Sequence, residues 1–92
     1  MPGREEIKQE VIEALKDHTG KSNITEEHHL TFDLDMSTNS KKSMALEYSN
    51  ISIRYGGSSI SSNKAAELET VKEAVDLVYS KTNPEEGDED EA

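Results

Sequence analysis

A run of hydroxyl side chains lies in the middle of the chain, in the stretch DLDMSTNSKKSMALE from Asp33 to Glu47. The stretch has the pattern of a helix start, with Ser37 as a preferred type of N-cap residue. An N-cap serine lies at the surface, and the positive end of a helix tolerates a phosphate group bonded to it. On residue type alone, Ser37 is simply a helix cap with an exposed hydroxyl.

Other possible sites in the sequence are weaker. The neighbours Glu26-Glu27-His28-His29 carry metal-binding side chains, but adjacent residues do not converge on one ion without a further spaced ligand. The hydroxyl and histidine residues show no Ser/His/Asp order of a hydrolase. The Gly56 to Ser59 stretch, GGSS, lacks the lysine and the preceding strand of a phosphate-binding loop. We therefore expect neither enzymatic activity nor a metal site.

Length and composition predict one small domain. The chain has 92 residues, no cysteine and a formal net charge of −10. This charge disfavours nucleic acid and anionic membranes as partners and favours basic patches on other proteins. No apolar run is long enough to span a membrane, and the N-terminal MPGREEIKQE lacks the apolar segment of a secretory signal. We expect a soluble, intracellular protein in the cytoplasm.

The acidity is concentrated at the C-terminal end. The last ten residues, NPEEGDEDEA, hold six carboxylates and no basic residue. Such a segment cannot bury enough apolar surface to offset its chain entropy. We therefore predict a folded domain over residues 1–80 and a disordered acidic tail over residues 81–92. The tail would act as a solubilising segment or, alternatively, as a docking segment for a basic partner.

Hydrophobic spacing predicts an all-α fold. Apolar residues recur at helical spacing over residues 4–17, and Gly20 is a plausible stop. A second helix is expected over about residues 37–51, a short one over 62–67, and a last one that ends near Ser80. The apolar residues expected to be buried in the second helix are Met44, Ala45, Leu46, Tyr48 and Ile51.

The connections between these helices carry their own signals. The first, over residues 19–36, is unusually long and needs buried residues to hold it, for which we expect Ile24, Leu30, Phe32 and Leu34. Residues 52–60 could alternatively form a β-hairpin around Gly56-Gly57. Before the last helix, Thr70 and Glu73 have the spacing of a capping box, with Thr70 as the N-cap and Glu73 reaching back.

The order of these elements and several short motifs resemble the acyl carrier protein family. The matching pieces are DL at Asp33-Leu34, MALE from Met44 to Glu47, and ISSNKAAELETVKEAVDLV from Ile60 to Val78. The resemblance covers most of residues 4–80. It implies a small four-helix bundle of acyl-carrier type, with three longer helices, one short helix and a long first loop. It also implies a covalent 4′-phosphopantetheine arm on a serine at the start of the second helix, in the pattern D-S-L.

The arm-site motif has a different order in this chain. It is Asp35-Met36-Ser37, so that counting back from MALE places the attachment position at Met36. Counting forward from DL places it at Thr38, and Ser37 lies between the two registers. The resemblance therefore implies that Ser37 carries the arm, with Thr38 or Ser40 as fallbacks. Surplus residues before Ile60 would be absorbed by a longer loop over residues 55–59.

The resemblance implies a monomeric carrier that does no bond-making itself. It would hold an acyl chain as a thioester for partner biosynthetic enzymes, in a fatty-acid, polyketide or lipid-modification pathway. The implied partners are a phosphopantetheinyl transferase and acyl-transferring or acyl-activating enzymes. Family members present an acidic second helix to basic patches, whereas this helix has Lys41 and Lys42 with no acid before Glu47. Dedicated partner enzymes follow as a hypothesis. The alternative is a carrier-like helical domain without an arm that acts as a protein-interaction module.

Overall fold

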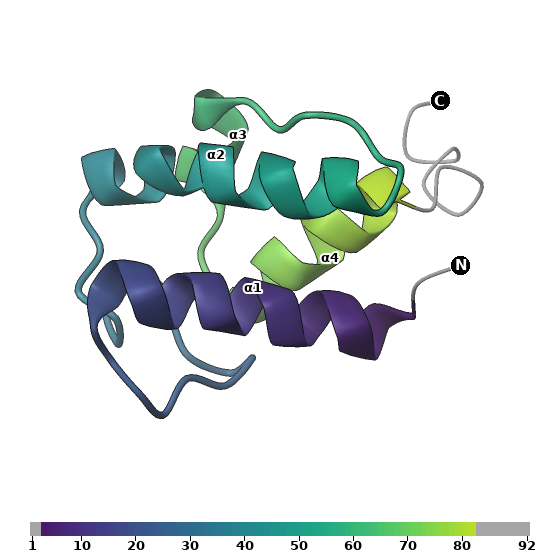
Figure 1. Ribbon diagram of the computed structural model, residues 1–92. Coiled ribbons are helices and arrows are strands. Elements are labelled where there is room, and N and C mark those ends of the chain that lie inside the picture. Colours follow the sequence, from purple (N-terminus) through teal and green to yellow (C-terminus); the bar gives the residue numbers. More distant parts are fainter. Residues whose placement is uncertain (1–2, 83–92) are drawn as a thin grey trace.

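Four helices form the regular structure of residues 3–82, the part of the chain that the computed structural model describes (Figure 1). They are α1 (Arg4–Thr19), α2 (Thr38–Arg54), α3 (Ser62–Glu67) and α4 (Val71–Thr82). The predicted all-helical fold is confirmed over these residues, which contain no strand. The alternative hairpin is wrong, because α2 continues through Arg54 and residues 55–61 form a loop to α3.

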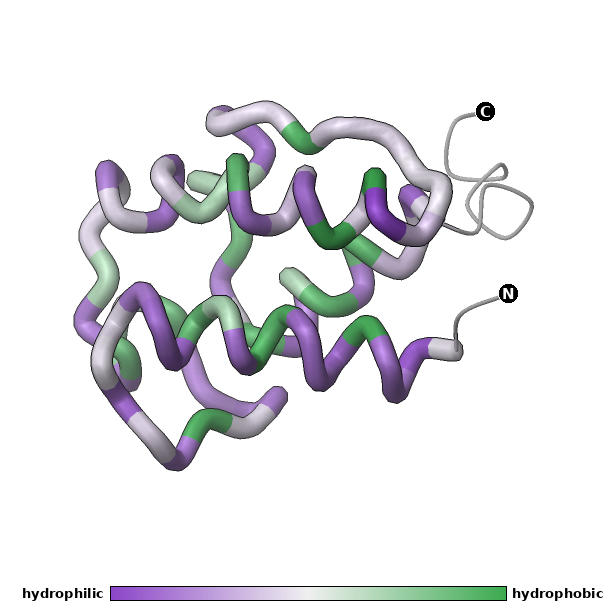
Figure 2. The backbone as a smooth tube through the Cα atoms, viewed as in Figure 1, coloured by the Kyte–Doolittle hydropathy of each residue, from purple (hydrophilic) through white to green (hydrophobic). Residues whose placement is uncertain are grey.

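The helices pack as a small bundle around one apolar core. α1 and α2 run antiparallel, α4 packs against both, and α3 packs against α2 (Figure 1). In Figure 2 the hydrophobic residues of α1 lie largely on the side that faces the other helices. The core residues without exposed surface are Ile7, Val11, Leu15, Leu30, Met44, Val71, Ala74, Val75 and Val78. Burial of these side chains gives the bundle its main stabilisation.

Local signals place the helix ends well. α1 ends at Gly20, whose positive φ of 77° a glycine adopts without strain, and whose N–H donates to the Lys16 carbonyl at 2.8 Å. At the start of α4, only one of the two hydrogen bonds of the predicted capping box is formed. The Glu73 N–H donates to Thr70 Oγ1 at 3.1 Å, but the Glu73 carboxylate accepts from the N–H of Glu69 rather than that of Thr70.

The long first loop, residues 20–37, is held to the start of α4 by backbone hydrogen bonds. The Leu30 N–H donates to the Glu69 carbonyl at 2.8 Å, and the Val71 N–H donates to the His28 carbonyl at 3.0 Å. Ile24, Leu30, Leu34 and Met36 are buried beneath it. These contacts explain how a loop of this length stays ordered within a small domain.

Two predicted core residues are exposed. Phe32 is 78% exposed, because it lies in a tight turn where the N–H groups of Asp33 and Leu34 both donate to the His29 carbonyl. Its ring instead lies against the His29 ring, with 4.4 Å between ring centroids. Leu46 is 66% exposed, because it lies on the outer side of α2 while Met44, Ala45, Tyr48 and Ile51 face the core.

The helices extend slightly beyond their predicted bounds. Lys81 and Thr82, which were expected in the acidic tail, are the last residues of α4. The rest of the predicted tail, from residue 83 onward, lies outside the described residues. None of the helices in the described part of the chain is long and apolar enough to cross a membrane.

Candidate functional site

Ser37 is the N-cap of α2. Its backbone is extended, with φ −75° and ψ 173°, and its Oγ accepts a hydrogen bond from the Ser40 N–H at 3.1 Å. The Ser37 carbonyl accepts from the Lys41 N–H at 2.9 Å, which begins the helix. Because the side chain is exposed, its hydroxyl is accessible from solvent at the positive end of the helix.

Residues 35 and 36 fix the position of this cap. The Met36 side chain is only 2% exposed, and its N–H donates to the Leu30 carbonyl at 3.1 Å. Asp35 has a φ of 60°, a left-handed conformation that aspartate adopts more readily than most residues. Its carboxylate forms an ion pair with Lys21, with 3.4 Å between Nζ and Oδ2. The chain therefore turns outward immediately after a buried methionine and presents Ser37 first.

The two fallback hydroxyls lie in the same turn but differ in their surroundings. Thr38 is exposed and is the first helical residue. Ser40 is half-buried, and its Oγ lies 3.0 Å from Nε2 of His18, near the end of α1. Ser37 therefore combines an exposed side chain with a single hydrogen bond to Oγ among residues 3–82, whereas the Ser40 hydroxyl is engaged by an imidazole.

The two lysines of the first turns have different roles. The Lys41 side chain turns toward the bundle, where Nζ donates to the Leu68 carbonyl at 2.9 Å. Lys42 is exposed and forms no ion pair within residues 3–82. Lys41 is therefore held to the bundle, because its ammonium satisfies a backbone carbonyl between α3 and α4.

The chemistry available to Ser37 is that of an accessible alcohol. Over the described part of the chain, no imidazole or carboxylate contacts its Oγ, so the site supplies no general base of its own. The first turn of α2 holds no acidic residue that would repel a bound phosphate. The turn can thus carry a phosphate-linked group that another protein attaches.

The groups with clearly shifted pKa values belong to other parts of the fold. The Arg4 guanidinium binds Glu26 of the first loop and Asp76 of α4, and the hydrogen bond from Arg4 lowers the pKa of Glu26. Hydrogen bonds from Tyr55 O–H and from Arg54 lower the pKa of Glu10. These two clusters join helices and loops, and neither includes Ser37.

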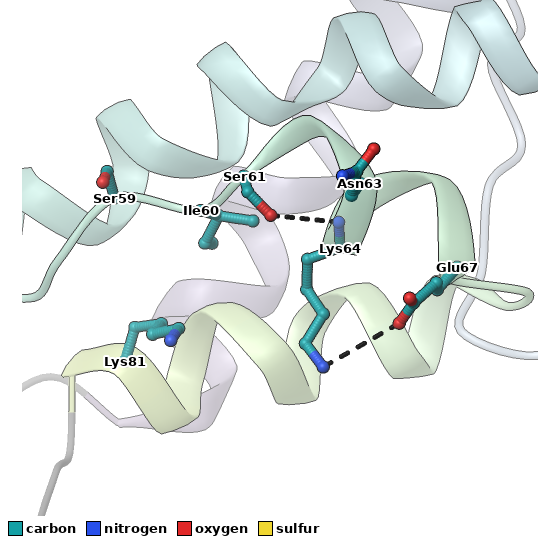
Figure 3. A pocket seen from close by; sticks show the side chains of 7 residues that line it. All are labelled: Ser59, Ile60, Ser61, Asn63, Lys64, Glu67 and Lys81. Atoms are coloured by element: carbon teal, nitrogen blue, oxygen red, sulfur yellow. Dashed lines mark hydrogen bonds and ion pairs between the residues drawn. The ribbon is translucent and has the colours of Figure 1, made fainter.

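A surface pocket lies between the loop that precedes α3, α3 itself and the end of α4 (Figure 3). Its lining residues are Ser59, Ile60, Ser61, Asn63, Lys64, Glu67 and Lys81. The Lys64 ammonium lies 3.9 Å from the Glu67 carboxylate, as the dashed line in Figure 3 marks. None of these residues comes from the first turn of α2, so the pocket is separate from the candidate site.

The two histidines of the first loop stabilise local turns by accepting backbone hydrogen bonds. His28 Nδ1 accepts from the Thr25 N–H, and His29 Nδ1 accepts from the N–H groups of Thr31 and Phe32. Residues 3–82 contain no group of three metal-ligating side chains that could hold an ion.

Sequence reasoning missed the two side chains that reach the α2 start from elsewhere. His18 approaches Ser40 from 22 residues away, and Lys21 pairs with Asp35 across the first loop. No local pattern signals these contacts, because they depend on how α1 packs against α2. A basic residue in the last turn of a helix is explained equally well by the helix dipole.

Comparison of the chain with protein-family models, with curated protein sequences and with solved structures finds no match. The function of the site is therefore argued from its own residues.

Proposed function

We propose that this protein is a discrete, monomeric acyl carrier protein that acts in the cytoplasm, with a 4′-phosphopantetheine arm on Ser37. The observation that carries the proposal is the position of Ser37 as the exposed N-cap of α2. The bundle around it supports the proposal, with its long first loop, short α3 and capped α4. Of the three residues of the displaced motif, Asp35, Met36 and Ser37, only Ser37 carries a hydroxyl, and its side chain is exposed.

The residues present fit the arm. The Ser37 hydroxyl would attack the pantetheine-side phosphorus of the coenzyme A pyrophosphate, forming a phosphodiester and releasing adenosine 3′,5′-bisphosphate. A phosphopantetheinyl transferase would supply the metal and the base that takes the serine proton. The resulting phosphate would lie at the positive end of α2, where no acidic side chain of the first turn opposes it. When attached, the arm supplies a thiol that holds an acyl group as a thioester for acyl-transferring or acyl-activating enzymes.

A second candidate function is a carrier-like domain without an arm that binds other proteins. Two observations favour it. Counting back from MALE places the attachment position at Met36, which is buried and has no hydroxyl. Leu46 and Ile53 of α2 are exposed, as residues of a binding surface would be. In this case Ser37 would act only as a helix cap.

The test is to incubate the full chain with coenzyme A and several phosphopantetheinyl transferases, followed by intact mass and peptide mapping. We expect a mass gain on the peptide that contains Ser37. Ser37→Asp should abolish the gain while preserving the helix, because aspartate caps as well as serine but offers no hydroxyl. Thr38→Ala and Ser40→Ala are the matched controls and should retain it.

Two results would contradict the proposal. If the folded protein gains no mass with any transferase, the arm-free interaction module becomes the better account. If the gain survives Ser37→Asp and is lost in Thr38→Ala or Ser40→Ala, the attachment position is wrong. Circular dichroism of each variant shows whether the helical fold is retained.

A further inference from the structure

The charge of α2 differs from that of the rest of the protein. Residues Thr38–Arg54 contain three basic side chains and one acidic one, a balance of +2, whereas the whole chain carries −10. The same count gives −2 for α1, from three basic and five acidic residues, and zero for α3 and α4. Within residues 3–82, α2 is therefore the only helix with a positive balance.

Only one of these basic side chains has no partner within residues 3–82. Arg54 is paired with Glu10 of α1, and Lys41 donates to the Leu68 carbonyl. Lys42 is exposed and has no ion-pair partner in the described part of the chain. Its ammonium therefore projects from α2 as an uncompensated charge.

Lys42 shares one face of α2 with two exposed apolar residues. The spacing of four, four and three residues along Lys42, Leu46, Asn50 and Ile53 places these side chains on one side of a helix. Leu46 is 66% exposed and Ile53 is 56% exposed. We name these four residues the outer α2 stripe. Two large apolar side chains exposed on one helix face, together with an unpaired cation, give a partner protein apolar area to bury and a charge to complement.

We propose that the outer α2 stripe docks a partner protein whose contact patch has an apolar centre and a carboxylate opposite Lys42. The identity of this partner as an acyl-handling enzyme rests on the proposed function, but the binding surface itself does not. Burial of an exposed apolar side chain is favourable in proportion to the area removed from water, which makes Leu46 and Ile53 the expected centre of the contact.

Charge complementarity selects this chemistry. A basic patch would place a cation against Lys42 and meet only Glu47 as an acid on α2. The net charge of −10 favours basic partners at long range, but at physiological ionic strength screening over about 8 Å leaves the local charge of the stripe dominant in contact. Specificity then comes from the stripe itself.

Two other occupants fit less well. A second copy of the chain that docked through the same stripe would bring a further Lys42, not a carboxylate, to the contact. The chain's own residues 83–92 offer six carboxylates, but their only apolar side chains are one proline and one alanine. They provide nothing of the size needed to cover Leu46 and Ile53.

The test uses a random peptide library displayed on phage and selected on the immobilised full chain, without the arm. We expect enrichment of peptides with large apolar residues flanked by Asp or Glu. Binding of a synthesised peptide should weaken about tenfold in Leu46→Asp and in Lys42→Glu, equivalent to about 1.4 kcal/mol. Replacing the peptide's acidic residues by lysine should restore its binding to Lys42→Glu.

Matched controls lie outside the stripe. Phe32→Asp changes an even more exposed apolar residue in the first loop, and Lys72→Glu changes an exposed cation on α4; neither should affect binding. Enrichment of basic peptides, or loss of binding in the controls alone, would overturn the proposal. So would a dimer by sedimentation that Leu46→Asp dissociates, or displacement of the peptide by a synthetic copy of residues 83–92.

The two proposals fail separately. Peptide binding is measured on protein that carries no arm, and Ser37→Asp should bind as the wild type does. A chain that binds acidic apolar peptides but gains no mass from transferases would retain the docking surface and lose the carrier function.

Discussion

Gly57, in the loop that follows α2, lies close to the end of α4. Its N–H donates to the Ser52 carbonyl at 2.7 Å. A Cβ at this position would lie 2.3 Å from Ser52 Oγ and 2.7 Å from the Lys81 carbonyl oxygen. Both distances are too short for non-bonded atoms, so a glycine is needed here for space rather than for its backbone freedom.

Gly57→Ala is therefore expected to lower the free energy of unfolding by about 1–3 kcal/mol, the usual cost of overpacking. The measurement is urea denaturation followed by circular dichroism.

Ser52→Ala provides the control for this contact. Its hydroxyl is buried without a hydrogen-bond partner in the described structure, so its removal alone should cost little. Combined with Gly57→Ala, it should recover part of the loss, because the nearest clashing atom is gone. Equal midpoints for the wild type and Gly57→Ala would show that the chain relaxes without cost.

Ser37 shows at the same scale how a structural role and a chemical role can coincide. Its Oγ accepts the Ser40 N–H through a lone pair, and the exposed side chain remains accessible to another protein. The helix cap therefore does not compete with attachment of a phosphate-linked group.

At the scale of elements, the first loop is as much a part of the core as the helices. Leu30 has no exposed surface, and its backbone N–H is bonded to the segment that precedes α4. The loop thereby positions Met36 and Ser37 at the start of α2. Its order depends both on this burial and on the backbone hydrogen bonds to the segment before α4, because the loop itself forms no helix or strand.

Leu30→Ala and Phe32→Ala form a matched pair within this loop. Leu30→Ala should cost about 2–5 kcal/mol, because it leaves a cavity among buried side chains. Phe32→Ala should change stability by less than about 0.5 kcal/mol, because its ring is exposed. Thermal or urea unfolding measures both, and a larger loss in Phe32→Ala than in Leu30→Ala would contradict the described packing of the loop.

For the whole molecule, two ion-paired glutamates predict how stability depends on pH. The pKa values of Glu10 and Glu26 are lower in the folded protein than the ordinary value of 4.5. Their stabilisation is therefore fully present above the unfolded-state pKa and is lost as the pH falls through the folded-state values. Tyr48 acts at alkaline pH. Burial raises its pKa from the ordinary value of 10.0, so its contribution is fully present below that value and is lost as the pH rises from there through the raised pKa.

We expect the free energy of unfolding to be nearly constant around neutral pH and to fall below about pH 5. Glu26→Gln should cost roughly 1 kcal/mol at pH 7, the upper end for a partly exposed ion pair, and the difference from the wild type should shrink as the pH falls. Urea midpoints measured from pH 7 to pH 3 give both curves. A difference that stays constant or grows toward low pH would show that Arg4 contributes nothing through Glu26.

Much of this architecture could be predicted from the sequence, because it depends on local rules. Helical spacing in α1 and α4 identifies the buried side of each, and Gly20, Ser37 and Thr70 mark helix ends through contacts three or four residues long. The all-helical fold and the Ser37 cap follow from such contacts alone.

The tertiary structure decided which apolar residues are exposed and which distant side chains pair, because residue type alone does not determine either. Leu46 and Phe32 are as apolar as their buried neighbours, but their exposure depends on which side of α2 and of the first loop the rest of the chain covers. The pairing of His18 with Ser40 arises from helices far apart in sequence. The sequence by itself determined which hydroxyl caps α2, because a cap is local; packing decided what surrounds that hydroxyl and which face of α2 stays open to a partner.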